Sequence, residues 1–279
     1  MKSINFWRHF LLKYGKRAVF VPWDLVRHAV FHNLRTGHHH ILLACMPKSG
    51  STYLSAILGN LPKFERIALI PGYSRREQEL DTALLLLNNR INYVAQHHVR
   101  YSDVTGMWLR DFGIRPVVLI RNIFDIVISL KDHVRKESHE ASMAYIRPEM
   151  AQWDDARLEE FIVRMVVPWY FNFYMSWMDC PDKEVVTYEE LTTSPATVLM
   201  RISKRFDLGF TEAQIASAVQ YSNQNTGLTR LNKGVSGRGR DLSERARTEI
   251  CAMASYYEGV DFSVIGIPSG QEHQVLGAL

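Results

Sequence analysis

The chain has 279 residues, of which 47% are apolar, so it can bury the core of one large α/β domain or two small ones and is not a disordered chain. It contains no run of 18 apolar residues, and the sequence therefore predicts no membrane-spanning helix. Three distant cysteines and the lack of a secretory signal pattern favour a reducing, cytoplasmic location.

Positive charge is concentrated at the start of the chain. Residues 1–40 hold seven basic residues against one acidic residue, a net +6, whereas the whole chain carries +4. The same segment contains two tryptophans, four phenylalanines and a tyrosine. We interpret residues 1–39 as a basic, aromatic, helical arm, and residues 1–36 are candidates for peripheral contact with an anionic membrane. The plainer alternative is an arm that packs on its own domain or on a second subunit, as in a homodimer.

The rest of the sequence alternates strand and helix patterns. In chain order we expect a strand at 40–45, a helix from 51, a helix at 74–89, strands at 92–99 and 116–120, a helix at 123–133, an aromatic stretch at 158–177 kinked at Pro168, a strand at 184–188, and helices at 195–206, 212–221 and 243–257. We interpret the aromatic stretch as core. The alternation predicts an α/β domain over 40–266, with a mostly parallel sheet flanked by helices on both faces, and a weakly ordered tail over 267–279.

Residues 46–53, Met-Pro-Lys-Ser-Gly-Ser-Thr-Tyr, join the first strand to the first helix. The free N–H groups and the dipole at a helix start favour an anion, and Gly50 lets the backbone approach it closely. Lys48 adds a charge, and hydroxyl donors come from Ser49, Ser51 and Thr52. A helix cap would explain only one of these residues. The stretch therefore predicts an anion site.

The next apolar strand indicates a second anion rather than a metal. A magnesium–triphosphate site uses an Asp at such a strand end and the order Gly-Lys-Ser/Thr, whereas here Lys48 precedes the glycine and residues 117–120 lead into Arg121. Ser129 lies two helical turns later, where it can converge with Arg121 on one phosphate. We interpret Asp125 as a carboxylate that suits the helix dipole. The three histidines at 38–40 cannot all face one ion, because neighbours in a strand alternate sides.

Together these residues resemble the sulfotransferase family, whose enzymes use 3′-phosphoadenosine 5′-phosphosulfate (PAPS) and release 3′,5′-ADP (PAP). Residues 47–53 resemble its 5′-phosphosulfate loop, with Tyr53 at the adenine-stacking position, and residues 121–125 with Ser129 resemble its 3′-phosphate motif. Residues 186–191 resemble the segment whose tyrosine, here Tyr188, helps to hold the adenine.

Lys233 and Gly234 resemble the late loop that returns to the 3′-phosphate. Asn232 stands there in place of the family's usual arginine, and Arg238 or Arg240 could take over that contact. The resemblance covers residues 41 to about 265 and implies a P-loop-like three-layer α/β sandwich.

The resemblance also implies a mechanism, in which the sulfuryl group passes in line from PAPS to an acceptor hydroxyl without a metal. Lys48 would stabilise the leaving phosphate, and Ser129 would hold that lysine. The expected base is a histidine at a strand end, where His97 and His98 must face opposite ways, and we favour His98. Glu65 and Glu77 are outside candidates, because some branches of the family use a carboxylate.

Several alternatives remain open at this stage. The acceptor can be a small molecule, a carbohydrate or a lipid-linked hydroxyl, and membrane contact by the arm would favour a glycolipid. The alternative function is a metal-dependent nucleotide phosphotransferase of related fold. A module that only binds anions or membranes would predict loss of Lys48 or of the base, and both are present. Nucleic acid is not an expected partner, because the chain after residue 40 is slightly acidic and its aromatics gather in an apolar stretch.

Overall fold

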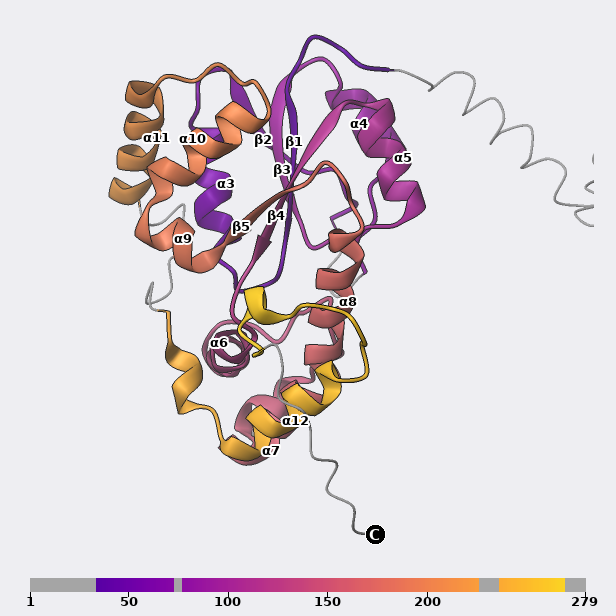
Figure 1. Cartoon of the computed structure of the whole chain (residues 1–279), viewed down its shortest axis with the longest axis vertical. Helices are drawn as coiled ribbons and strands as arrows, with labels where there is room; N and C mark the ends of the chain where they lie inside the picture. The colour runs from indigo at the N-terminus through magenta and orange to yellow at the C-terminus, as the bar shows by residue number, and fades with distance from the viewer. Residues whose placement is uncertain (1–33, 73–76, 226–235, 269–279) are drawn as a thin grey trace, which may run out of the picture.

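The computed structural model describes residues 34–72, 77–225 and 236–268, and its centre is a five-stranded sheet (Figure 1). The strands lie in the order β2-β3-β1-β4-β5, and all neighbours are parallel. Their bounds are β1 His40–Cys45, β2 Phe64–Ile67, β3 Asn92–His97, β4 Ile114–Ile120 and β5 Glu184–Thr187. The chain order reverses between β1 and β4, so a crevice is expected outside the carboxyl ends of these two strands.

Helices cover both faces of the sheet, as the sequence predicts. One face carries α3 (Ser51–Gly59), α10 (Pro195–Arg205) and α11 (Glu212–Gln224). The other carries α4 (Thr82–Asn88), α5 (Asp103–Asp111) and α8 (Val167–Met178). Leu43 of β1 packs into the first layer and Leu42 into the second. Burial on both faces explains why β1 is a continuous apolar run rather than an alternating pattern.

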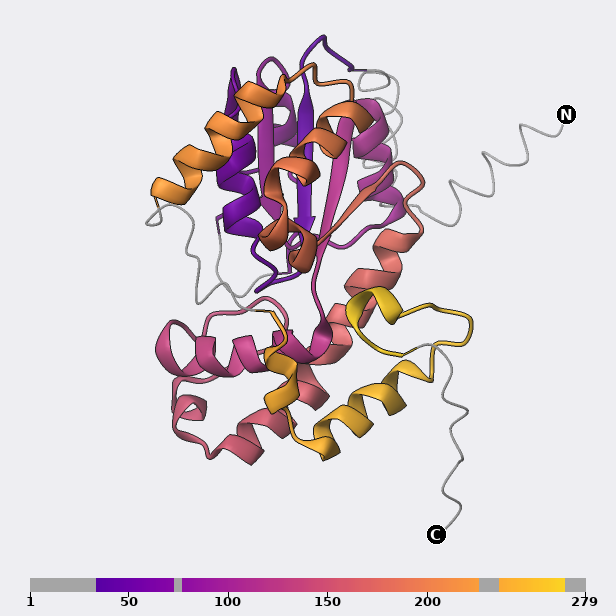
Figure 2. The same cartoon turned by 60° about the vertical axis from the view of Figure 1, so that its left-hand side comes forward.

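A further group of helices lies beyond the carboxyl ends of the strands (Figure 2). It contains α6 (Ile123–Lys136), the 3₁₀ turn η2 (Pro148–Gln152), α7 (Asp155–Phe161), the 3₁₀ turn η5 (Arg238–Asp241), α12 (Glu244–Ala254) and the 3₁₀ turn η6 (Ser263–Ile265). α9 (Tyr188–Thr193) follows β5 directly. Because α6 starts immediately after β4, this layer adjoins the crevice.

The structure corrects several expected boundaries. Of the helix predicted over 74–89, the described residues contain only α4, which starts where the Asp81 carboxylate accepts the N–H groups of Ala83 and Leu84. Residues 74–76 lie outside the described residues. Residues 77–80 precede α4 as irregular chain. β2 and α5 were not expected. β2 buries only Phe64, and α5 contains Val104, Thr105 and Gly106, all weak helix formers.

The kink expected at Pro168 takes the form of a π turn, η3 (Ile162–Val166), just before the proline. The Val167 N–H donates to the Ile162 carbonyl five residues back. Pro168 then lies in the first turn of α8, where a backbone N–H would not donate to a carbonyl of the same helix, so proline is tolerated. The aromatic residues of α8 are buried in the core, as interpreted from the sequence.

A buried ion cluster joins α6, α7 and α12. The Lys131 ammonium lies 2.8 Å from an Asp155 carboxylate oxygen and 3.0 Å from a Glu159 oxygen. The second Glu159 oxygen accepts the hydroxyl of Ser243, the N-cap of α12. Lys131 and Glu159 are both buried, so their charges depend on each other for solvation.

Lys131→Ala should lower the free energy of unfolding by about 3–5 kcal/mol, because it leaves the Glu159 carboxylate buried and uncompensated. Urea unfolding measures this change. The matched control is Lys136→Ala, later in the same helix. Lys136 forms an exposed pair with Asp132, and this pair should contribute less than about 1 kcal/mol to the free energy of unfolding. Equal effects of the two substitutions would contradict a special role for the buried cluster.

Candidate active site

Two helices begin side by side at the crevice. Residues 46–50 connect β1 to α3, and Arg121 and Asn122 connect β4 to α6. β1 and β4 are hydrogen-bonded neighbours, and their paired positions run up to Cys45 and Leu119. Both helix N-termini are therefore presented at one edge of the sheet, where their N–H groups favour anions.

The loop before α3 contains two left-handed residues, Lys48 with φ 65° and Gly50 with φ 81°. Gly50 is the N-cap of α3 and supplies no side-chain cap, which removes the interpretation that a serine or threonine only caps this helix. A Cβ on Gly50 would lie 3.0 Å from the Tyr188 ring, so glycine is needed for close approach as well as for its φ. Ser51 accepts a hydrogen bond from the Gln96 amide at 2.9 Å.

Lys48 is held by two residues at the far end of α6 that sequence reasoning did not identify. Its ammonium lies 3.2 Å from the Glu137 carboxylate and 3.4 Å from Nδ1 of His133. His133 Nδ1 also lies 2.8 Å from the same carboxylate oxygen. Burial raises the pKa of Glu137, but the His133 hydrogen bond and the Lys48 charge outweigh it and hold that pKa below its usual value. Glu137 is thus an ionised partner of Lys48.

Arg121 connects the two predicted anion sites. Its guanidinium is buried, donates to the Lys48 carbonyl at 2.9 Å and lies 4.0 Å from the centre of the Tyr188 ring. The structure thus brings Lys48, Arg121 and Tyr188 together. Ser129 is buried two turns into α6. The side-chain contacts of Lys48 are to Glu137 and His133, and the predicted contact between Ser129 and the lysine stays a prediction.

Asp125 does more than complement the helix dipole. Its carboxylate accepts the N–H groups of Gly237 at 2.8 Å and Gly239 at 2.5 Å, and it lies 3.5 Å from Arg121. Gly239 must be a glycine here, because a Cβ would lie 2.6 Å from Cβ of Phe124. The contacts fix the chain that follows the predicted late loop onto the start of α6. Lys233 and Gly234 themselves lie outside the described residues.

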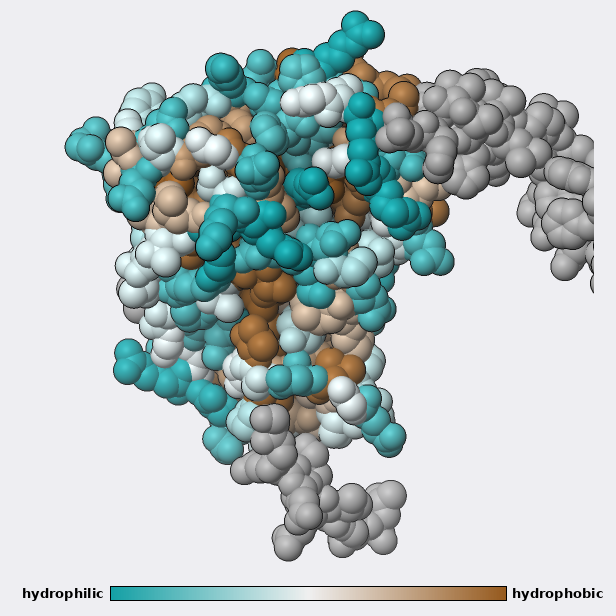
Figure 3. Space-filling model, turned by 45° about the horizontal axis from the view of Figure 1, so that its top comes forward, coloured by the Kyte–Doolittle hydropathy of each residue, from teal (hydrophilic) through white to brown (hydrophobic). Residues whose placement is uncertain are grey.

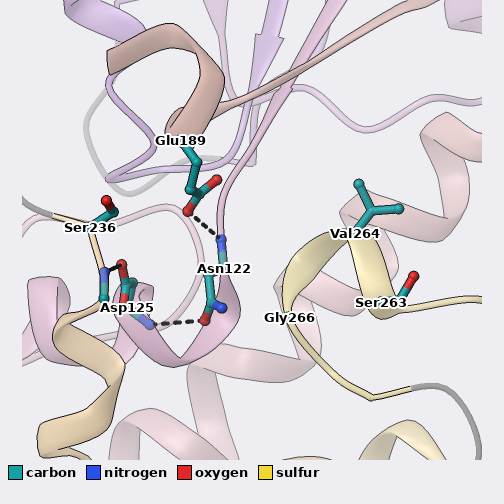
Figure 4. Close-up of a pocket in the computed structure, with 8 residues that line it drawn as sticks. Asn122, Asp125, Glu189, Ser236, Ser263, Val264 and Gly266 are labelled. Atoms are coloured by element: carbon teal, nitrogen blue, oxygen red, sulfur yellow. Dashed lines mark hydrogen bonds between the residues drawn. The ribbon is translucent and has the colours of Figure 1, made fainter. Parts of the chain in front are cut away.

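A pocket of about 430 Å³ opens beside this junction (Figure 4). Asn122 lies at its centre, and its backbone N–H donates to Glu189 of α9 at 3.5 Å. Of the two arginines considered for the 3′-phosphate, Arg238 pairs with Asp132 of α6 at 2.5 Å. That pair turns Arg238 toward α6, so its predicted substitution for the missing arginine requires the pair to break.

Tyr53 is anchored at the start of α3. Its ring belongs to the core between α3 and the sheet, and its hydroxyl donates to Asn223 of α11 at 2.7 Å. Tyr188 is also buried, but its ring covers Arg121. Of the two tyrosines predicted at the adenine, Tyr188 contacts Arg121 of the anion site, whereas the Tyr53 hydroxyl binds Asn223.

The two candidate histidines have different environments. His97 is buried, and its Nε2 accepts the Leu69 backbone N–H at 2.8 Å. Burial, with a smaller contribution from the charge of His98, lowers the pKa of His97 to about 3. His97 is therefore a neutral residue that holds the chain after β2.

His98 has the tautomer that a base requires. Its Nδ1 lies 2.8 Å from the Cys45 carbonyl, and since a carbonyl only accepts, Nδ1 carries the proton and Nε2 has the lone pair. Burial lowers the pKa of His98, and the Cys45 hydrogen bond opposes this only in part. The His98 backbone N–H donates to Gln78 at 2.6 Å, a positioning contact that the sequence did not reveal. Because Cys45 ends β1, His98 is tied directly to the start of the anion loop.

The carboxylate candidates are less suited to act as bases. Glu77 accepts Nε of Arg100 at 3.0 Å and the indole N–H of Trp169 at 3.1 Å. Both donors bind the same carboxylate oxygen, so Glu77 is held in contacts with the surrounding fold. Glu65 is an exposed residue of the edge strand β2, two strands away from β1.

The described residues contain no cluster of three or more His, Cys, Asp or Glu side chains arranged to hold a metal ion. Within the same ranges, no helix is long and apolar enough to cross a membrane.

Comparison with known proteins agrees with this geometry. Residues 38–227 match the family model of the sulfotransferase domain, and no curated protein sequence matches the chain significantly. The fold is similar to that of mouse sulfotransferase SULT7A1 complexed with PAP, with a TM-score of 0.58 and 16% identity over 78% of this chain and 85% of that one.

It is also similar to retinol dehydratase in complex with androsterone and the inactive cofactor PAP, with a TM-score of 0.53 and 14% identity over 82% of each chain. Because the family model spans all five strands of the sheet and both loops of the crevice, the chain belongs to the sulfotransferase family and is an enzyme of that class.

Proposed function

We propose that this enzyme transfers the sulfuryl group of PAPS to an acceptor hydroxyl, with His98 as the base. The observation that carries the proposal is the junction of Lys48 and Arg121 at two adjacent helix N-termini, one strand away from a neutral histidine with a free Nε2 lone pair. Two of the similar structures contain PAP, which supports the same nucleotide here.

The residues suggest a simple division of roles. His98 Nε2 accepts the proton of the acceptor hydroxyl while the oxygen attacks sulfur. The bond between sulfur and the bridging oxygen breaks, and the new charge on the 5′-phosphate is stabilised by Lys48 and the N–H groups at the start of α3. No metal ion is needed for this charge balance, because Lys48 and the helix dipole supply the positive charge.

The rest of the donor would occupy the second anion site. Arg121 and Ser129 would hold the 3′-phosphate together with Lys233 and Gly234 of the late loop, and Tyr188 and Tyr53 would flank the adenine. Asp125 supports this arrangement indirectly, because it fixes both Arg121 and the chain just after the late loop.

The acceptor is proposed only as a hydroxyl compound. The similar retinol dehydratase structures contain androsterone or retinol, each with PAP. These complexes make a small apolar alcohol a reasonable first substrate class to test, beside the carbohydrate and lipid-linked hydroxyls expected from the sequence.

Calorimetric titration should show metal-free binding of PAP that is unchanged by EDTA or magnesium, and weak binding of ATP. The reason is that the two cations lie at two separate helix N-termini, which suits a nucleotide with separate 5′- and 3′-groups rather than a triphosphate with its metal. Magnesium-dependent ATP binding without a response to PAP would favour the alternative, a nucleotide phosphotransferase.

His98→Ala should abolish transfer and leave the affinity for PAP close to that of the wild type, because His98 acts on the acceptor and not on the nucleotide. As pH falls, wild-type kcat/KM should decrease only below pH ~6.5, because burial lowers the pKa of His98 and keeps it unprotonated at higher pH. His97→Gln is the control, because it should lower the free energy of unfolding without removing the catalytic base. Full activity in His98→Ala and none in His97→Gln would reverse the assignment.

Glu137→Gln should tighten PAP binding by about five- to tenfold, because an anion that binds Lys48 must compete with the Glu137 carboxylate. Titration calorimetry at low salt measures the change. Glu140→Gln, an exposed acid three residues later, is the matched control and should have no effect. Weaker binding in Glu137→Gln would show instead that the carboxylate holds Lys48 in its productive position.

A further inference from the structure

One buried hydroxyl contacts the anion loop from a distant part of the chain. The Tyr170 hydroxyl, in the first turns of α8, donates to the Pro47 carbonyl at 3.2 Å. α8 begins in the helical layer beyond the strand ends and runs back beside the sheet, as Figure 1 and Figure 2 show. Because proline has no N–H, this carbonyl is the only backbone hydrogen-bonding group of Pro47. Tyr170 therefore fixes the orientation of the Pro47 carbonyl.

The peptide groups on both sides of Lys48 are held by side chains from other elements. The group before the Lys48 Cα contains the Pro47 carbonyl, which accepts the Tyr170 hydroxyl. The group after it contains the Lys48 carbonyl, which accepts the Arg121 guanidinium at 2.9 Å. The orientations of these two peptide groups determine φ and ψ of Lys48.

The backbone of Lys48 lies in a conformation that needs such support. Its φ is 65°, in the left-handed region, which costs free energy for a residue with a side chain. A change to negative φ would turn the Cα–Cβ bond and displace the ammonium. Small displacements of a catalytic group have large effects on rate. The two hydrogen bonds from Tyr170 and Arg121 therefore oppose a relaxation that would misplace Lys48.

Tyr170 is itself held firmly. Its side chain belongs to the core and has no exposed area, so it forms no part of the mostly hydrophilic face that Figure 3 shows. The Trp169 ring packs edge-on against it at 5.4 Å, and the Trp169 indole N–H is anchored on Glu77. Burial raises the pKa of Tyr170 well above its usual value, although the charge of Arg121 opposes this. The hydroxyl therefore remains protonated and can donate.

We propose that Tyr170 is a positioning residue for sulfuryl transfer. Together with Arg121 it holds Lys48 in the left-handed conformation that presents the ammonium to the 5′-group of the donor. The proposal rests on the proposed function, because it takes Lys48 as the residue that contacts this group. Tyr170 acts only through Lys48, so loss of its hydroxyl should weaken the interactions that Lys48 makes with the donor.

Tyr170→Phe removes only the hydroxyl and should weaken PAP binding by about three- to tenfold in titration calorimetry, the range that one hydrogen bond contributes. The matched control is Tyr174→Phe, one turn later in α8, whose hydroxyl donates to the Asp261 carbonyl at 2.7 Å. Each substitution removes one hydrogen bond from α8 to a backbone carbonyl, but only Pro47 belongs to the anion loop. Tyr174→Phe should therefore bind PAP like the wild type. Equal losses of affinity in the two variants would overturn the proposal.

A double-mutant cycle tests whether Tyr170 acts through Lys48. In the Lys48→Met background, Tyr170→Phe should change PAP affinity by less than about twofold, because the side chain that Tyr170 positions is gone. The full loss of affinity in that background would overturn action through Lys48. Replacement of Tyr170 by 4-aminophenylalanine keeps an N–H donor at the tip of the ring and should restore PAP affinity to within about twofold of the wild type. A folded variant of this kind with the affinity of Tyr170→Phe would contradict the role of the hydrogen bond.

The reactivity of Lys48 provides a measurement that does not depend on the nucleotide. Its side chain is 18% exposed and is paired with Glu137. Acetylation by N-acetoxysuccinimide, followed by mass spectrometry, should be about three- to tenfold faster at Lys48 in Tyr170→Phe, because the lysine is no longer held in place. The rate should not change in Tyr174→Phe.

An unchanged acetylation rate in Tyr170→Phe would overturn the proposal, whether or not PAP binds. Absence of PAP binding by the wild type would instead refute the proposed function, and the acetylation rates would still decide whether Tyr170 holds Lys48 in place. The two failures are therefore distinguishable.

Discussion

The site depends on one buried cation, the guanidinium of Arg121. A buried charge is costly unless it is paired and hydrogen-bonded, and here the partners are the Lys48 carbonyl, the Asp125 carboxylate and the face of the Tyr188 ring. Each partner belongs to a different part of the chain. Asp125 also accepts two N–H groups from the segment at Gly237. The contacts that stabilise the charge of Arg121 therefore hold together the loop after β1, the start of α6 and the chain that follows the late loop.

The positive charge at the crevice is balanced by carboxylates on the same helix. Asp125 at the start of α6 pairs with Arg121, and Glu137 at its end pairs with Lys48. An anion that binds Lys48 would have to displace Glu137, whereas Asp125 is also held by two backbone N–H groups and stays in place beside Arg121.

The sequence revealed the parts of the site that are local in the chain. The loop at 46–53, the strand ending in Arg121 and the histidine pair are each short patterns with a physical reason. Glu137 and Gly239 were missed because they meet their partners across 89 and 114 residues, and no local periodicity encodes such contacts. The start of α4 was misplaced for a similar reason: Glu77 and Gln78 are used in contacts with Arg100 and His98, which override their helix propensity.

The carboxyl edge and the amino edge of a parallel sheet differ in their electrostatic environment. Helices that return between parallel strands start at the carboxyl edge, where their N-termini attract anions, and end at the amino edge, where their C-termini attract cations. Arg110 in the last turn of α5 and Arg90 just after α4 follow this rule. These two arginines are thus stabilised by the fold itself, so the positive charge at the amino edge places no demand on the residues of the crevice at the carboxyl edge.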